Sequence, residues 1–331
     1  MTMTNNDKAP TTSTVVMGHA SNAGKWMLQG GTLVALIALI LFFFLMRPDV
    51  FLGFTNVRNI LYQVSILAII AAAQTMVMVV GDFDLSVGAN SSLAGATAAA
   101  LMLGGTPIPI AILAALVVGT LIGLFNGYLV AYLKVSAFVA TLASMTSVIG
   151  ISYLVTGGTT LFNFPPEFNA LGQGRLFEIP LPVYFAVVVA LATWFVLRYT
   201  TIGRRWYAVG GNHEVSRLSG VNVRRVRLIA FVLAGTVSAL GGILLAARLG
   251  SASATQDGNN MMFAVAAVFL GMTIARSGAA NLVGTMIGVM IIGVLANGLN
   301  ILGVNAYIQQ VITGLIIVAA VTLSGLRSRE R

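Results

Sequence analysis

Charged residues are scarce in this sequence. Only 8% of its 331 residues are Asp, Glu, Lys or Arg, whereas 58% are hydrophobic, and the mean hydropathy is +0.94. A water-soluble domain of this length needs many more charged side chains to cover its surface. The composition therefore excludes a soluble globular protein and indicates a chain whose main solvent is the lipid bilayer.

Cysteine is absent, and only two histidines occur. Without cysteine the chain has no disulfide bond, no thiol nucleophile and no thiolate metal ligand. His19 lies in a polar leader and His213 in a charged loop, so the two cannot belong to one metal-binding cluster. We expect two solvated histidines and no metal site.

The net charge of +9 comes from 18 Lys and Arg residues against nine acidic ones. A basic protein often binds nucleic acid, but these basic residues gather in loops between apolar segments and not along one soluble face. They therefore indicate orientation in a membrane, and no nucleic-acid partner is expected.

Apolar segments that can cross the bilayer occupy most of the chain. A helix needs about 20 residues to cross about 30 Å of hydrocarbon, and backbone hydrogen bonding in lipid favours helices. About ten segments qualify: 28–46, 60–80, 86–103, 108–131, 137–155, 181–197, 226–247, 263–275, 282–295 and 308–323. We predict an all-α polytopic membrane protein with about ten transmembrane helices over 28–324. A disordered cytoplasmic tail, 1–27, precedes them, and a basic cytoplasmic tail, 325–331, follows them.

Ten crossings place both ends of the chain on one side, and the basic residues test this arrangement. With that topology, 14 of the 18 Lys and Arg residues fall on the side of the two tails. The four on the other side are Arg47, Arg58, Arg175 and Arg248. Because positively charged loops remain in the cytoplasm, we expect both termini there.

Two segments, 86–103 and 282–298, are rich in Gly, Ala, Ser and Thr. Small side chains let two helix backbones approach closely, whereas leucine would hold them apart. We therefore expect both segments in the interior of the helix bundle.

The basic loop 198–227 is the only large cytoplasmic loop of this topology. Its centre, 212–218, follows Gly210 and Gly211 and predicts a short helix. Asn212 is a candidate N-cap, and Glu214 lies in the first turn, where the helix dipole favours a negative charge. The loop is either a docking surface for another protein or a contact with anionic lipid headgroups, and the second alternative does not explain the Gly-Gly-Asn-x-Glu pattern.

Five motifs occur in an order that is similar to one transporter family. They are GDFDLSVGA at 81–89, FNGYLVAYLKVSAFVATL at 125–142, VTGGT at 155–159, GRRWYAVGGNHEVSRLSGVNVRRVR at 203–227 and NGLNILGV at 297–304. Together they resemble the permease subunits of ribose-type (monosaccharide) ABC importers, in the branched-chain amino acid and ribose transport permease superfamily. The resemblance covers nearly the whole hydrophobic chain.

This resemblance implies a subunit that carries a monosaccharide, polyol or similar neutral solute across a bacterial inner membrane and catalyses no covalent reaction. It implies three protein partners besides the lipid bilayer: an ABC ATPase subunit, a periplasmic solute-binding protein, and a second permease copy or a paralogue. In such permeases the short cytoplasmic helix fits a cleft of the ATPase. The residues that the resemblance assigns to this coupling are Gly210, Gly211, Asn212, Glu214, Arg217 and Gly220.

No cofactor is expected on this chain, since ATP and Mg²⁺ would bind the partner ATPase. The nearest approach to a phosphate-binding loop is GHASNAGK at 18–25, which has five residues instead of four between its glycines. Trp26 also stands where Ser or Thr would meet the metal ion.

Polar side chains within or beside the apolar segments are candidates for the solute path. Amides can hydrogen-bond a hydroxylated solute, although each can equally join two helices. Asp82 and Asp84 either contact the solute or cap the next helix, with Asp84 or Ser86 accepting bonds from its free amides. We find no buried basic partner for them, and the absence of buried charge favours a neutral solute. The candidate path residues are Gln74, Asp82, Asp84, Asn90, Asn126, Asn297 and Asn300.

Some positions depart from the family pattern. Met261 and Phe263 stand where relatives often carry acidic residues, and Ile149 stands where many have Arg. The identity of the solute and the choice between homodimer and heterodimer stay open. An ion-coupled secondary transporter is the alternative function. An intramembrane enzyme is excluded, since no Ser, His and Asp set and no catalytic pair of carboxylates lies at membrane depth.

Overall fold

The computed structural model describes residues 22–273 and 278–329, and most of them are helical. Fourteen helices and one two-stranded hairpin lie in these residues. The first seven helices are α1 (Asn22–Met46), α2 (Pro48–Phe51), α3 (Phe54–Val79), α4 (Val87–Leu103), α5 (Ile108–Ala131), α6 (Ala137–Thr156) and α7 (Pro166–Gln173). The hairpin β1 (Arg175–Leu176) and β2 (Ile179–Pro180) is antiparallel. The remaining helices are α8 (Leu181–Tyr199), α9 (Thr201–Gly211), α10 (His213–Leu218), α11 (Val223–Leu249), α12 (Gly258–Met272), α13 (Leu282–Ile301) and α14 (Ala306–Arg329).

Each apolar segment predicted from the sequence overlaps a helix of the described structure. Among the described residues, six helices are long and apolar enough to cross a membrane: α3, α5, α6, α8, α11 and α13. Shorter apolar helical stretches occur in α1, α4, α12 and α14. The chain is thus a mostly helical, polytopic membrane protein, as predicted.

The described residues include part of each predicted tail. Residues 1–21 of the predicted tail 1–27 lie outside the described part of the chain, and α1 begins at Asn22. At the other end, α14 continues to Arg329, beyond the predicted boundary at residue 324.

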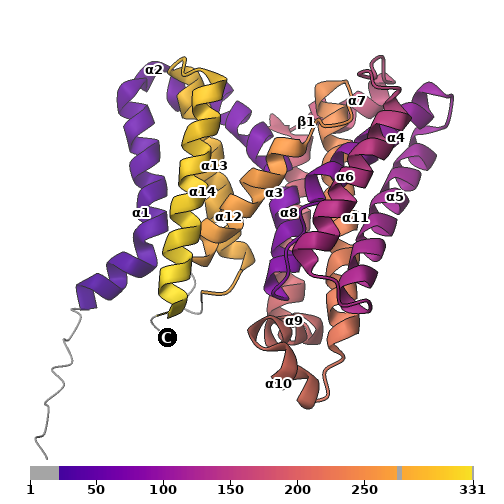
Figure 1. Ribbon diagram of the computed structural model, residues 1–331. Helices are drawn as coiled ribbons and strands as arrows, with labels where there is room; N and C mark the ends of the chain where they lie inside the picture. The colour runs from indigo at the N-terminus through magenta and orange to yellow at the C-terminus, as the bar shows by residue number, and fades with distance from the viewer. Residues whose placement is uncertain (1–21, 274–277, 330–331) are drawn as a thin grey trace, which may run out of the picture.

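Two long helices, α3 and α11, form the centre of the bundle (Figure 1). α11 packs against α3, α4, α5 and α7, and α3 also packs against α8, α12 and α13. Within the apolar window of α3, 83% of the residues are buried, compared with 22% in α5. α3 is therefore a core helix, and α5 presents most of its apolar surface outward, where lipid is the expected solvent.

Small residues bring the inner helices into close contact. A Cβ atom at Gly242 of α11 would lie 1.8 Å from the Ser91 carbonyl oxygen of α4. A Cβ atom at Gly288 of α13 would lie 2.2 Å from the Ala267 carbonyl oxygen of α12. α4 is buried over most of its length, and α13 is buried along the face with Gly284 and Gly288. The predicted interior position of both glycine-rich segments is confirmed.

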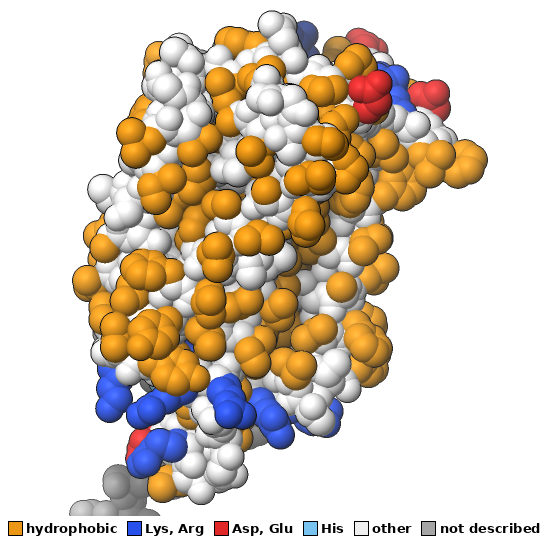
Figure 2. Space-filling model, turned by 90° about the vertical axis from the view of Figure 1, so that its right-hand side faces the viewer, with side chains coloured by type: hydrophobic (Ala, Val, Ile, Leu, Met, Phe, Trp, Pro, Cys, Tyr) orange, Lys and Arg blue, Asp and Glu red, His pale blue; other side chains and the backbone are white. Residues whose placement is uncertain are grey.

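The two ends of the molecule carry different structures. α9 and α10 project from one end, while α2, α7 and the hairpin lie at the other (Figure 1). On the face shown in Figure 2, hydrophobic side chains cover the middle of the molecule, and Lys and Arg side chains gather below them, toward the end with α9 and α10. This distribution fits an apolar belt for the bilayer with a basic rim on one side.

Candidate solute site and coupling surface

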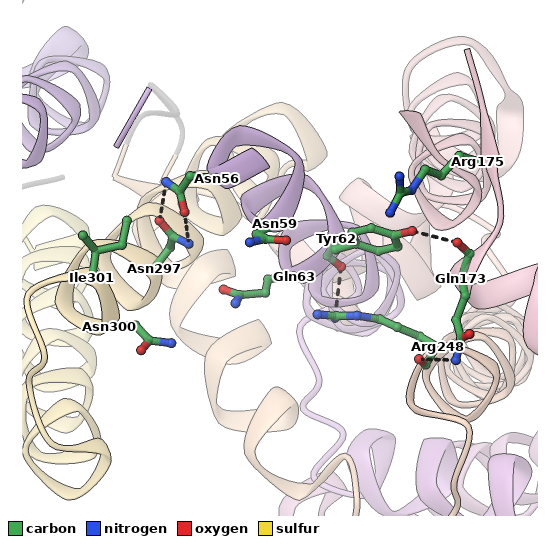
Figure 3. Close-up of a pocket in the computed structure, with 10 residues that line it drawn as sticks. All are labelled: Asn56, Asn59, Tyr62, Gln63, Gln173, Arg175, Arg248, Asn297, Asn300 and Ile301. Carbon is green, nitrogen blue, oxygen red and sulfur yellow. Dashed lines mark hydrogen bonds between the residues drawn. The ribbon is translucent and has the colours of Figure 1, made fainter. Parts of the chain in front are cut away.

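A polar pocket opens at the end of the molecule opposite α9 and α10 (Figure 3). Its volume is about 510 Å³, which is within the range of small-molecule sites. Helices α3, α7, α11 and α13 and strand β1 contribute its lining. The lining residues are Asn56, Asn59, Tyr62, Gln63, Gln173, Arg175, Arg248, Asn297, Asn300 and Ile301.

Two facing walls of this pocket are fixed by hydrogen bonds (Figure 3). On one wall, the side-chain amides of Asn56 of α3 and Asn297 of α13 bond to each other. Each Nδ2 donates to the other residue's Oδ1, and both distances are 3.0 Å. On the other wall, the Tyr62 hydroxyl donates to the Gln173 carbonyl oxygen at 3.0 Å, and Arg248 donates to the Tyr62 carbonyl oxygen at 3.1 Å. The pocket therefore has a fixed outline before any solute enters.

Three amide side chains on the pocket lining have no hydrogen-bond partner among the described residues: Asn59, Gln63 and Asn300. Figure 3 shows Asn59 and Gln63 between the two fixed walls and Asn300 beside the wall that holds Asn297. An amide offers both a donor and an acceptor, which is what a hydroxyl group needs from a binding site. The lining holds two arginines and no carboxylate. It can thus hydrogen-bond a solute rich in hydroxyl groups.

The opposite end of the molecule is formed by α9 and α10. Asn212 caps α10, because its side-chain oxygen accepts hydrogen bonds from the backbone N–H groups of Glu214 and Val215 at 2.9 and 3.0 Å. The short helix and its N-cap are confirmed. Glu214 forms an ion pair with Arg217, and this hydrogen bond and positive charge lower the pKa of Glu214.

The exposed surface of α10 also carries apolar side chains. Val215 is 58% exposed and Leu218 is 74% exposed. Such residues, together with the charged pair on a six-residue helix, form a protruding surface that suits docking against another protein.

Comparisons with known proteins identify the family of the chain. Residues 56–321 match the family described as branched-chain amino acid transport system / permease component. The chain belongs to this permease family. It is a transport component and not an enzyme.

Several curated relatives of the permease are similar over nearly their whole length. The ribose import permease protein RbsC of Haemophilus influenzae is 39% identical over 90% of this chain and 93% of its own. RbsC of Bacillus subtilis is 38% identical with the same coverage. The D-allose transport system permease protein AlsC of Escherichia coli is 33% identical over 90% of this chain and 92% of its own. No solved structure matches the chain.

The surface formed by α9 and α10, which is the candidate coupling surface, rests directly on the end of α3. A Cβ atom at Gly210 would lie only 2.0 Å from the Val79 carbonyl oxygen, so only glycine allows α9 to pack this closely. His213 of α10 lies 3.1 Å from the Val80 carbonyl oxygen through its Nε2 atom. Gly220, with φ of +82°, makes the turn that follows α10, whereas Gly211 has no close neighbour. Of the two consecutive glycines, Gly210 is the one that packing requires.

Two of the predicted path residues, Asn297 and Asn300, line the pocket. The sequence analysis missed Asn56, Asn59 and Gln63, although their spacing of three and four residues puts them on one face of a helix. Asn56 and Asn59 precede the apolar segment that was predicted to begin at residue 60, and Gln63 lies in its first turn. The polar face that these three residues form was therefore not assigned to a transmembrane helix.

Three other predicted amides lie away from the pocket. Asn90 donates to Gly235 O at 3.1 Å and Ser238 Oγ at 2.9 Å, which joins α4 to α11. Asn126 of α5 donates to Ser86 Oγ at 2.7 Å. Gln74 of α3 is 1% exposed, and neither atom of its amide is bonded to a described residue.

The two predicted aspartates have structural partners. Asp84 accepts hydrogen bonds from the backbone N–H and the hydroxyl of Ser86 at 2.8 and 2.6 Å, just before α4 begins. Asp82 receives two hydrogen bonds from Arg227, at 2.6 and 2.5 Å. The expectation that no buried basic partner exists was therefore wrong, because Arg227 lies 145 positions away in sequence and approaches only in the fold.

A third buried carboxylate, Asp257, was not foreseen. It is 1% exposed and lies at the N-cap of α12. Its carboxylate accepts hydrogen bonds from Ser91 and Asn260, and its backbone N–H donates to Ser92 Oγ at 2.9 Å. The interior is thus not free of acidic groups, which corrects the expectation of absent buried charge. The hydrogen bonds tie the start of α12 to α4.

No three His, Cys, Asp or Glu side chains in the described ranges lie close enough together to hold a metal ion.

Proposed function

We propose that the permease is the membrane-spanning subunit of an ATP-driven importer for a monosaccharide, a polyol or a similar neutral solute. ATP and Mg²⁺ bind a separate ATPase subunit, a periplasmic binding protein delivers the solute, and a second permease copy or a paralogue completes the path. The protein lies in a bacterial inner membrane with ten crossings and with both termini in the cytoplasm. The described ends of α1 and α14, which lie toward the same end of the molecule as α9 and α10, support this orientation (Figure 1).

The observation that carries this proposal is the course of α3. Its first turns bear the pocket residues Asn59 and Gln63, and its last residue, Val79, packs against Gly210 of α9. The helix has 26 residues, so it spans about 39 Å at 1.5 Å per residue. One continuous helix therefore connects the solute pocket with the surface that would receive the ATPase.

The proposed solute class follows from the pocket and from the relatives. The amides of Asn59, Gln63 and Asn300, unpaired among the described residues, suit hydroxyl groups. By name, the relatives are a ribose import permease and a permease of a D-allose transport system. The coupling role falls on Gly210, Gly211, Asn212, Glu214, Arg217 and Gly220, which all lie on or beside α9 and α10.

The test is uptake into proteoliposomes that contain the permease, its ATPase and its binding protein. Labelled ribose, allose and galactose are supplied outside, and ATP is enclosed or withheld. We expect uptake of at least one sugar that requires ATP and persists when an ionophore removes the ion gradients. Uptake that stops with the ionophore while ATP remains would replace the importer by the ion-coupled secondary transporter.

The coupling assignment has a matched control. Glu214→Ala with Arg217→Ala removes the exposed ion pair of α10, and Arg58→Ala with Glu178→Ala removes the ion pair at 3.6 Å at the other end of the molecule. We expect only the first double variant to lose the ATPase during purification in mild detergent. Equal retention of the ATPase by both variants would contradict the assignment.

A further inference from the structure

A groove runs along α8, beside α13 at first and beside α3 at its far end, and its two ends differ in chemistry. At the end near α9, a cavity of about 590 Å³ is bordered by Arg198 and Arg204, with Tyr207 and Trp194 beside them. Arg198 belongs to the last turn of α8, and Arg204 belongs to α9. This end of the groove is basic and polar.

The groove continues as an apolar channel away from the arginines. An adjoining stretch of about 420 Å³ shares Trp194, Leu282 and Val283 with the basic cavity. Its lining consists entirely of apolar side chains, among them Met290. A third stretch of about 330 Å³ shares Ala190, Leu191 and Met286 with the second. The three stretches therefore form one groove.

The length of this groove corresponds to one leaflet of a membrane. Along α8 it extends from Arg198 to Val183, which is about 22 Å at 1.5 Å per residue. Half of a bilayer with its headgroups is roughly 20 to 22 Å thick. A molecule with a polar head and a long apolar chain therefore matches the groove from end to end.

The charge at the basic end is not neutralised by any acidic side chain of the described residues. Neither Arg198 nor Arg204 has an ion pair or a side-chain hydrogen bond with a described residue, and both are exposed. Burial raises the pKa of the Tyr207 phenol above its usual value, and the neutral hydroxyl can donate a hydrogen bond. Asn281 on the same cavity caps α13, whose N-terminus carries a partial positive charge.

We propose that this groove binds one anionic phospholipid, with its phosphate at Arg198 and Arg204 and an acyl chain along α8, against α13 and then α3. The guanidinium groups of Arg198 and Arg204, which have no ion pair with a described residue, favour a headgroup with net negative charge over a zwitterionic one. The apolar stretch favours a lipid over a free phosphate, since an inorganic ion leaves that stretch unfilled. The proposal goes beyond solute transport and does not depend on which solute is carried.

The test measures lipid retained by the whole purified chain in detergent micelles, by native mass spectrometry. Palmitoyl-oleoyl phosphatidylglycerol is titrated against phosphatidylcholine with the same chains, and inorganic phosphate serves as a third arm. We expect one tightly held phosphatidylglycerol per chain, phosphatidylcholine bound at least tenfold more weakly, and no competition by millimolar phosphate. Equal affinity for the two lipids, or displacement of phosphatidylglycerol by phosphate, would overturn the proposal.

Two pairs of variants locate the site. Arg198→Gln with Arg204→Gln should weaken phosphatidylglycerol binding at least tenfold. The control, Arg224→Gln with Arg225→Gln, removes the same charge from exposed positions outside the groove. It should change phosphatidylglycerol binding less than twofold. Ala190→Phe fills the apolar stretch and should abolish retention of the lipid, whereas Ala192→Phe, on an exposed part of α8, should not. Equal effects within either pair would refute the site.

Folding of each variant is checked by its elution volume and thermal unfolding midpoint. If the arginine variant does not fold, the Ala190→Phe and Ala192→Phe pair decides the matter. Photocrosslinking of an azide-labelled phosphatidylglycerol to wild type gives an independent result. Label on the peptide containing Trp194 would support the site, and label confined to other helices would refute it.

Discussion

Asp82 and Arg227 form a two-bond ion pair whose side chains are only 6% and 17% exposed. The pair joins the turn after α3 to the first turns of α11, the two central helices of the bundle. This ion pair therefore joins the two helices, α3 and α11, that run from the candidate coupling surface to the end with the pocket.

Removal of only one member of this pair should destabilise the permease strongly. Arg227→Gln leaves a buried carboxylate without its partner, and we expect a loss of about 3 to 5 kcal/mol in the free energy of unfolding. The double variant Asp82→Asn with Arg227→Gln should recover most of that loss. A double-mutant cycle by denaturant unfolding in micelles measures the coupling energy, and simple additivity of the two single effects would show that the pair does not act as a unit.

Gln63 permits a test of the pocket itself. Its amide has no partner in the described structure, so Gln63→Leu should leave the fold intact while removing one hydrogen bond to the solute. The loss of about 0.5 to 1.5 kcal/mol should lower uptake roughly 2- to 12-fold at saturating binding protein. Gln310→Leu, at an exposed position of α14 outside the pocket, is the control. Equal uptake by both variants would remove Gln63 from the solute site.

Among the helices, α4 and α11 show how close the backbones lie. Gly242→Ala would place a methyl group 1.8 Å from the Ser91 carbonyl oxygen, so the helices must separate. We expect a loss of about 1 to 3 kcal/mol in stability, as for other overpacked cores. Gly150→Ala on α6 has nothing within 4 Å of the new Cβ atom and should stabilise by about 0.5 to 1 kcal/mol. Unfolding midpoints of the two variants should move in opposite directions.

Helix α10 depends on its N-cap more than a long helix does. It has six residues, too few for a helix to persist without tertiary support, and Asn212→Ala removes about 1 kcal/mol of capping energy. We expect faster amide hydrogen exchange over residues 212–219 and weaker retention of the ATPase. Asn222→Ala removes the equivalent cap of the 27-residue α11, and exchange within that buried helix should stay slow. Slow amide exchange in α10 of the Asn212→Ala variant would show that the N-cap does not stabilise this helix.

The helices of this molecule can be predicted from its sequence more completely than its polar contacts can. Hydropathy located all the apolar helices, with α5 predicted at its observed bounds, since lipid leaves a long apolar segment little choice but to form a helix. The N-cap Asn212 was recognised because capping is local. The pairing of Asp82 with Arg227, and of Asp257 with Ser91, depends on helix packing and has no local signal. Helix α9 was missed because its glycine-rich sequence resembles a loop.

For the molecule as a whole, the absence of cysteine makes its orientation directly measurable. Thr160 and Ser219 are exposed at opposite ends of the bundle, after α6 and after α10. Single variants Thr160→Cys and Ser219→Cys, each with one thiol in the entire chain, should react with a membrane-impermeant maleimide from opposite sides of intact cells and inverted vesicles. We expect Ser219→Cys to react only from the cytoplasm. Labelling of both from one side would contradict the proposed topology.

The middle of α3 is buried on all sides, while its ends touch the pocket and the coupling surface. A stiff helix held at its centre behaves as a lever. With about 20 Å on each side of the centre, a tilt of 5° would move each end by about 1.7 Å, in opposite directions. In the proposed importer, thermodynamic linkage then makes the effect reciprocal. The factor by which ATPase closure changes the affinity of the pocket for solute equals the factor by which bound solute changes the equilibrium of ATPase closure.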